Sequence, residues 1–138
     1  MPADLSKKMT PETVGTGIHN LEPFRQFSPE DANVVVMYED VDQTLVVWNL
    51  EPGQENAPHV HPANAHTMTV LSGDGLLLQD GDASAPIKAG DCIVIPRNVI
   101  HGIRNTGKTR LSYLAVTTNG AEGYVKQSAN GEPVRVNH

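Results

Sequence analysis

Four histidines are the residues of this chain best suited to do chemistry. His59, His61 and His66 lie within one short stretch, and His101 follows after several apolar segments. Imidazole is the commonest metal ligand among protein side chains. Side chains two residues apart point to the same face of a β-strand, so His59 and His61 would present their rings together. The spacing indicates a metal site.

Two breaks in the sequence suggest how the other histidines could join this pair. Residues 62–65 allow the chain to reverse before His66 opens another strand, and residues 96–99 read as a tight turn ahead of a strand that carries His101. Three strands would then bring four imidazoles to one point inside a barrel.

The elements that must position these histidines are short β-type segments. They are rich in Val, Ile, Leu and Thr and are separated by turns containing Gly, Pro and Asp. The predicted strands are Val34–Tyr38, Thr44–Leu50, Thr67–Leu71, Gly75–Gln79, Cys92–Ile95, His101–Arg104 and Leu111–Thr117. Strands at intervals of about ten residues favour an all-β sandwich or barrel over βαβ units. We therefore expect an antiparallel barrel with little helix.

A chain of 138 residues is most simply one domain. Residues 1–30 are polar and predict an N-terminal arm, draped over the body or over a partner subunit at a dimer interface. Residues 31–125 carry the barrel, and residues 126–138 form a Gly-, Asn- and Pro-rich tail that we expect at the surface.

Composition limits the partners. The net charge of −6 and the pI of about 5.4 argue against a nucleic-acid surface, which needs a clustered basic face. No apolar stretch approaches the roughly 18 residues that span a bilayer, and the first residues do not resemble a secretory signal. The single cysteine, Cys92, lies in an apolar run and is predicted to be a buried, inert thiol. These features favour a cytoplasmic protein that binds neither nucleic acid nor membrane.

The two histidine-bearing stretches resemble the two signature motifs of the cupin superfamily. In the first motif, Gly53, His59, His61 and Gly73 match in register, and His66 stands where the family has a glutamate. In the second motif, Gly90, Pro96, His101 and Asn105 match, and Asn98 replaces the inner glycine. The resemblance covers residues 53–105. It implies a small monocupin, an antiparallel double-stranded β-helix (jelly-roll) barrel that holds a metal.

The two departures from the motifs differ in weight. Asn98 fits a turn that needs positive φ, because asparagine is the best substitute for glycine there. His66 removes the only anionic ligand, so four neutral imidazoles would leave the ion its full charge. Such a shell favours Fe, Co, Ni, Cu or Zn over Mg or Ca, and similar four-histidine monocupins also hold Mn. A structural zinc site remains an alternative, as does a three-histidine site without His66.

The resemblance implies a metal-dependent enzyme, most simply a dioxygenase-like oxidoreductase whose small organic substrate chelates the metal. The alternatives are a non-redox isomerase, cyclase or lyase, and a non-catalytic binder of small ligands. No inward carboxylate is evident near the motifs, since Glu55 and Asp91 lie in or beside turns. The chain must therefore find a base elsewhere or do without one, and we expect Lewis-acid activation with little acid–base help.

Strand alternation suggests which side chains could line a pocket beside the metal. Met68 and Val70 share the face of His66, and Ile103 shares the face of His101, while Trp48 and Tyr113 are further candidates. Such residues more commonly form simple core. Small barrels also expose edge strands, which proteins protect by pairing or covering them. We therefore expect a homodimer.

Overall fold

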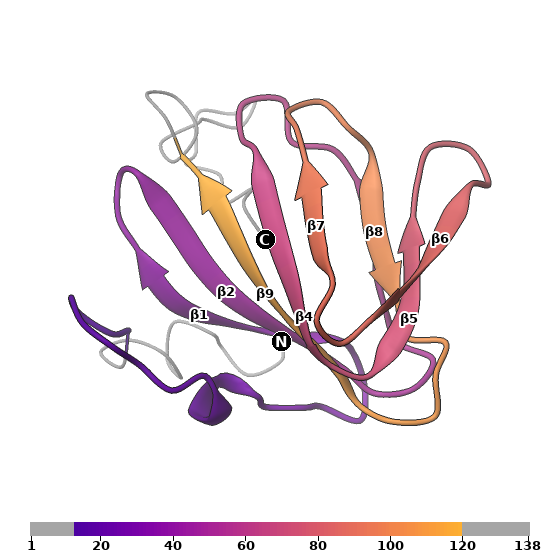
Figure 1. Ribbon diagram of the computed structural model, residues 1–138, viewed down its shortest axis with the longest axis horizontal. Coiled ribbons are helices and arrows are strands. Elements are labelled where there is room, and N and C mark those ends of the chain that lie inside the picture. Colours follow the sequence, from indigo (N-terminus) through magenta and orange to yellow (C-terminus); the bar gives the residue numbers. More distant parts are fainter. Residues whose placement is uncertain (1–12, 120–138) are drawn as a thin grey trace.

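The protein folds into two antiparallel β-sheets that face each other, in a computed structural model that describes residues 13–119 (Figure 1). One sheet has the order β1-β2-β9-β4-β7, formed by β1 (Asn33–Glu39), β2 (Gln43–Leu50), β9 (Leu111–Thr118), β4 (His66–Ser72) and β7 (Cys92–Ile95). The other has the order β3-β8-β5-β6, formed by β3 (Glu55–His59), β8 (His101–Arg104), β5 (Asp74–Leu78) and β6 (Ser84–Lys88). One short 3-10 helix, η1 (Glu22–Phe24), precedes β1. The predicted all-β barrel with little helix is confirmed.

Seven of the strands lie within one residue of their predicted bounds, but β3 and β6 are missing from the sequence-based prediction. Each of these two contains a proline, Pro58 in β3 and Pro86 in β6. Proline cannot donate to a sheet ladder, so it argues against a strand in the middle of a sheet. Both strands lie at the edges of the four-stranded sheet, where that loss is tolerated. The sequence does not reveal which strands are edges.

The inner face of the five-stranded sheet is arranged in rows across β2, β9 and β4. Leu50 pairs with Leu111 at one end of the barrel, and the next rows are Trp48-Tyr113-Val70 and Val46-Ala115-Met68. These residues belong to one buried apolar cluster, against which Trp48 packs from its edge. Fully burying such a side chain contributes roughly 1.5–3 kcal/mol. This cluster fills the barrel from the Leu50–Leu111 end to the row directly below the histidines.

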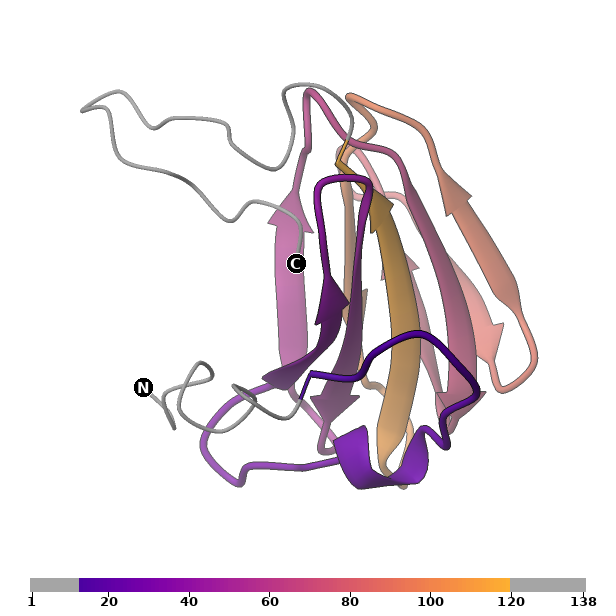
Figure 2. The ribbon, with the colours of Figure 1, turned by 90° about the vertical axis from the view of Figure 1, so that its left-hand side faces the viewer.

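The N-terminal arm covers part of the opposite, outer face of the same sheet (Figure 2). Val14 and Leu21 pack with the buried Phe24 against a second apolar cluster formed by Val35, Met37 and Val47. The backbone N–H of Val14 also donates to the carbonyl of Met37 at 2.9 Å. The described part of the arm therefore packs on its own subunit.

The prediction that Cys92 is buried is wrong. β7 alternates strictly, so that Ile93 and Ile95 enter the core whereas Cys92 and Val94 point outward. β7 is an edge strand of the five-stranded sheet. A continuous apolar run suggests burial on both faces, but the outer face of this edge is left uncovered by the described residues.

The turn before β8 matches the expectation for Asn98. Its φ is +66°, which makes it the one non-glycine residue with positive φ among residues 13–119. Asparagine tolerates this conformation better than other residues with a Cβ atom. The turn can therefore deliver His101 without the glycine that the motif has at this position.

Part of the predicted domain organisation lies outside the described residues. This applies to the tail, residues 126–138, and to residues 1–12 of the arm. Among the residues that the structure describes, no helix has both the length and the apolar character needed to cross a membrane.

Candidate metal centre

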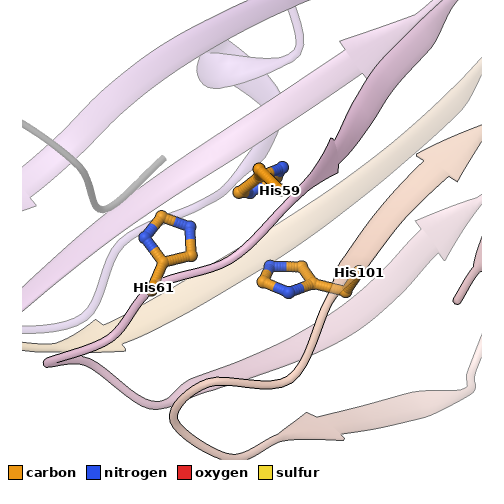
Figure 3. Close-up of side chains that lie close together, drawn as sticks. All are labelled: His59, His61 and His101. Atoms are coloured by element: carbon orange, nitrogen blue, oxygen red, sulfur yellow. The ribbon is translucent and has the colours of Figure 1, made fainter. Parts of the chain in front are cut away.

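Three histidines converge at one end of the barrel (Figure 3). His59, His61 and His101 each offer a ring nitrogen, and these nitrogens all lie within 4.8 Å of one another. The ring centroids of His59 and His101 are 4.4 Å apart, and those of His59 and His61 are 4.7 Å apart. The fold thus brings together three histidines that lie up to 42 positions apart in the sequence (101 − 59).

Pairing between β3 and β8 places two of these residues. His59 is the last residue of β3 and pairs with His101, the first residue of β8. The register shifts between Asn56 and His59, and this bulge re-aims the end of the strand. His61 lies beyond β3, so the expectation that one strand carries both rings is wrong. The carbonyl of His61 instead accepts a hydrogen bond from the backbone N–H of Asn98 at 3.1 Å.

Gly102 is a positioning residue that the sequence reasoning missed. A Cβ atom at this position would lie 2.7 Å from the carbonyl oxygen of Asn56 and 2.8 Å from the nitrogen of Pro58. Only glycine therefore lets the bulged end of β3 lie this close to β8. The signal available in the sequence is a glycine in the interior of a predicted strand, which often marks a close backbone approach.

Backbone carbonyls fix the tautomers of two histidines. The Nδ1 of His59 lies 2.6 Å from the carbonyl oxygen of Ala57, and the Nδ1 of His101 lies 2.9 Å from that of Val99. A carbonyl can only accept, so each Nδ1 carries the proton and each Nε2 presents a lone pair. Metal-binding histidines are commonly held in this way by a backbone carbonyl.

His66 lies beside this group without completing it. Its ring centroid is 4.2 Å from that of His61 and 5.0 Å from that of His101, and its side chain is buried. The set of mutually close ligand nitrogens nevertheless contains only the other three histidines. The predicted four-histidine site is therefore not confirmed, because three rings cluster and the fourth lies next to them.

Burial lowers the pKa of His101 below its ordinary value, because the charged imidazolium is poorly solvated there. The hydrogen bond to Val99 opposes this effect, and the nearby His59 adds to it. A lowered pKa favours the neutral ring, which is the form that binds metals.

The chemistry of the donor set fits a divalent transition metal. The Nε2 of His59 is buried and has no hydrogen-bond partner, which is costly for a polar atom unless an ion occupies the space beside it. Metal–nitrogen bonds of about 2.0–2.1 Å allow two ligands up to about 4.2 Å apart, so small side-chain shifts would suffice. His59, His61 and His101 could therefore hold one ion.

The residues proposed to line a pocket are placed mainly in the core. Met68, Val70, Ile103 and Tyr113 are buried, and Trp48 stacks on Tyr113 with a centroid distance of 6.3 Å. Asn56 donates from Nδ2 to the Tyr113 hydroxyl at 3.1 Å. Burial raises the pKa of Tyr113 far above its ordinary value, so this side chain stays a neutral hydroxyl.

The fold and the histidine cluster together define a cupin-type barrel. A sequence profile for the cupin domain (Cupin_2) matches residues 46–117, which is more than half of the chain. This range contains all four histidines of the first and second motifs. The chain belongs to the cupin family.

Its relatives include proteins named for oxalate. The chain is 37% identical over 67 residues to an oxalate-binding protein of Thermotoga maritima, and 37% identical over 75 residues to oxalate oxidase 1 of Hordeum vulgare. Each match covers 49% of this chain, but only 54% of the first relative and 37% of the second. A solved double-stranded β-helix protein of Klebsiella pneumoniae has a TM-score of 0.73 and 31% identity, and the match covers 78% of this chain and 93% of that one.

Proposed function

We propose that this cupin is a metal-dependent oxidoreductase that acts, dioxygenase-like, on a small organic substrate. The convergence of His59, His61 and His101 carries the proposal. His66 would serve as the fourth ligand after a small rotation, since its ring already lies against that of His61. When bound, an ion such as Fe, Mn, Ni, Cu, Co or Zn would supply Lewis acidity and, for the redox-active members, electron transfer to dioxygen.

The residues of the chain would orient and shield the reaction. Fixed Nδ1 protons on His59 and His101 hold their Nε2 atoms toward the site, so little reorganisation accompanies metal binding. Below the histidines, Val46, Met68 and Ala115 close the barrel with apolar atoms. A substrate would therefore approach from the histidine end and be excluded from the apolar core.

The candidate substrate class is a small chelating organic acid, enol or phenol. A six-coordinate ion held by four histidines has two positions left, which suits a bidentate oxygen donor. Relatives named as an oxalate oxidase and an oxalate-binding protein support carboxylates as the first class to test. The apolar interior below the site favours compact molecules.

The test begins with metal analysis of the protein isolated from its native host. Iron or manganese would support oxygen chemistry, and zinc would support the non-redox isomerase, cyclase or lyase. Oxygen uptake is then measured with Fe(II)- and Mn(II)-loaded protein on a panel of oxalate, diketones and catechols, with His59→Ala as the matched control. Absence of turnover with either metal across the panel contradicts the redox proposal, and turnover with Zn(II) under anaerobic conditions replaces it with the non-redox one.

A binding function is the second candidate, supported by the relative named as an oxalate-binding protein. Calorimetry would then give tight association of oxalate with the metal-loaded protein, and mass spectrometry would recover the ligand unchanged. Consumption of the ligand would refute this alternative.

We further propose a homodimer. β7 is an edge strand whose outward residues include Cys92 and Val94, and the exposed fraction of Val94 is 70%. Exposed apolar edges are commonly covered by a partner. Light scattering after size exclusion would give about twice the 14.9 kDa chain mass, and a mass equal to one chain would refute the dimer.

A further inference from the structure

A cavity lies between the N-terminal arm (Figure 2) and the outer face of the five-stranded sheet, the face turned away from the barrel interior. Residues 14–21 of the arm form one wall, and β1, β2 and β9 form the other. The cavity volume is about 470 Å³, which lies within the range of small-molecule sites. The arm therefore leaves enough space against the sheet for a small ligand.

The floor of this cavity is apolar. Five of its lining side chains also belong to the outer apolar cluster or pack against it, namely Val14, Leu21, Met37, Leu45 and Leu114. Leu45 and Leu114 are only half-buried, so a ligand placed over them would remove further apolar surface from water. The floor favours a ligand with an apolar body.

Two polar side chains of the lining offer hydrogen-bond acceptors to this space. The Nε2 of His19 lies 2.7 Å from the carbonyl oxygen of Gly15, which can only accept, so Nε2 carries the proton and Nδ1 presents a lone pair. The Tyr38 hydroxyl donates to Oδ2 of Asp40 at 2.6 Å, so toward a ligand it can only accept. A ligand group that donates hydrogen bonds matches both residues.

The charge beside the cavity is negative. Asp40 and Asp42 lie in the turn between β1 and β2, next to the lining residues Tyr38 and Gln43. The Tyr38 hydroxyl, helped by two backbone N–H groups, holds the pKa of Asp40 below its usual value, so this carboxylate is ionised at neutral pH. Among the described residues that line the cavity, none is Lys or Arg. A cation is therefore attracted to this place and an anion is repelled.

We propose that this cavity binds a small alkylamine, whose apolar body lies over Leu45 and Leu114 and whose ammonium group donates hydrogen bonds at the polar wall. An ammonium group has several N–H donors and a positive charge, so it suits both the acceptors and the acidic turn. An alcohol suits only the acceptors, and a carboxylate suits neither. This inference goes beyond the proposed function, because the cavity shares no residue with the histidine cluster.

The test compares octylamine, octan-1-ol and octanoate, which have nearly the same size and differ in charge. Each is titrated calorimetrically into the full chain at neutral pH and low salt, below the concentration at which it forms micelles. Octylamine is expected to bind at least about tenfold more tightly than octan-1-ol, because hydrogen bonds with a charged partner are the stronger ones. Octanoate is expected to bind more weakly than the alcohol. Absence of octylamine binding, or octylamine binding no tighter than that of either other ligand, overturns the proposal.

A variant that fills the cavity locates the binding. Leu114→Trp adds bulk from β9 and is expected to weaken octylamine binding by at least about tenfold. Thermal unfolding shows whether this variant is folded, and the ligand series on the unchanged protein tests the proposal without it. Unchanged octylamine affinity in the folded variant would place the ligand elsewhere, including at the metal centre, and overturns the proposal.

A second variant tests the charge. Asp40→Asn is expected to lower octylamine affinity by about threefold to tenfold and to leave that of octan-1-ol unchanged. The matched control is Asp82→Asn, in the turn between β5 and β6 of the other sheet, which is expected to change neither affinity. Equal effects of the two substitutions on octylamine would overturn the preference for a cation.

Two other occupants of the cavity would give different results. Lys7 and Lys8 lie outside the described residues, and octylamine binding that appears only in the Lys7→Gln, Lys8→Gln double variant would show that lysines of this chain occupy the cavity. Binding that appears only in dilute protein would show that a second copy does so. Either result overturns a small amine as the occupant.

Discussion

The two ends of the barrel are built from the same strands and carry opposite chemistry. At one end, β2 and β9 meet at Leu50 and Leu111, both fully buried in the apolar cluster. At the other end, the corresponding row holds Thr44, Thr117 and His66. Apolar burial stabilises the first end, whereas the second keeps polar groups that ligands can use. The same strands of one sheet thus contribute mainly to stability at their apolar end and carry the possible metal ligands at their other end.

The strongest test of this division is a cavity at the apolar end. Leu50→Ala is expected to lower the free energy of unfolding by about 2–5 kcal/mol, because the removed atoms leave a fully buried space. Urea denaturation of the metal-free protein measures this loss. Zn(II) affinity of the folded variant should stay within a factor of two or so, since changes at distant sites are nearly independent. A large drop in affinity would show that the two ends are coupled.

The converse change removes a ligand at the histidine end. His101→Ala is expected to weaken Zn(II) binding by more than about 100-fold, beyond the loss typical of residues that merely support ligands. The stability of the metal-free protein should change much less than in Leu50→Ala. Chelator competition measures the affinity. His66→Ala sharpens the result: a loss similar to that of His101→Ala would make His66 a fourth ligand, and an unchanged affinity would leave three.

A smaller effect is expected where backbone packing positions the site. Gly102→Ala would push the new Cβ into the backbone of Asn56 and Pro58, costing about 1–3 kcal/mol of stability. Displacement of β3 from β8 would also move His59 away from His101, with a loss of Zn(II) affinity of about tenfold. Gly15→Ala serves as the control, because nothing lies within 4 Å of its new Cβ and its φ is not positive. Unchanged affinity in Gly102→Ala would contradict the positioning role.

The smallest effect concerns pH at the hairpin that joins β1 and β2. The hydrogen bond from the Tyr38 hydroxyl, with help from the backbone N–H groups of Gln43 and Asp42, holds the pKa of Asp40 below its usual 3.8. Because the folded pKa lies below the unfolded one, the stabilisation is present at neutral pH and is lost as pH falls through the folded pKa. Tyr38→Phe should raise the pKa of Asp40 in a carboxyl NMR titration, and an unchanged value would contradict this assignment.

Much of the fold followed from local pattern. Seven strands and the positive φ at Asn98 agree with the sequence, because β-branched alternation and turn residues act over a few positions. The missed strands, β3 and β6, contain Pro58 and Pro86 and depend on lying at an edge of the sheet. The wrong prediction for Cys92 has the same origin, since exposure of an edge strand is set by what covers it.

The candidate site was predicted less completely. Motif spacing identified His59, His61 and His101, but a count of residues could not show that His66 stands beside the cluster and not within it. The inward position of Glu39 at the end of β1 could not be predicted either, because a one-residue bulge changes the face on which it lies. The register depends on both paired strands, so it cannot be predicted from the sequence of one strand alone.

By itself, the sequence determined the class of barrel, most of its strands, and the histidines that could bind a metal, because hydrophobic alternation and ligand spacing are local properties. Only the tertiary structure decided which imidazoles meet, how Gly102 admits the bulged end of β3, and that Glu39 faces inward. These depend on pairing between strands far apart in the chain. In such strand pairs, a single bulge or the absence of a Cβ atom at a glycine changes which side chains lie next to each other.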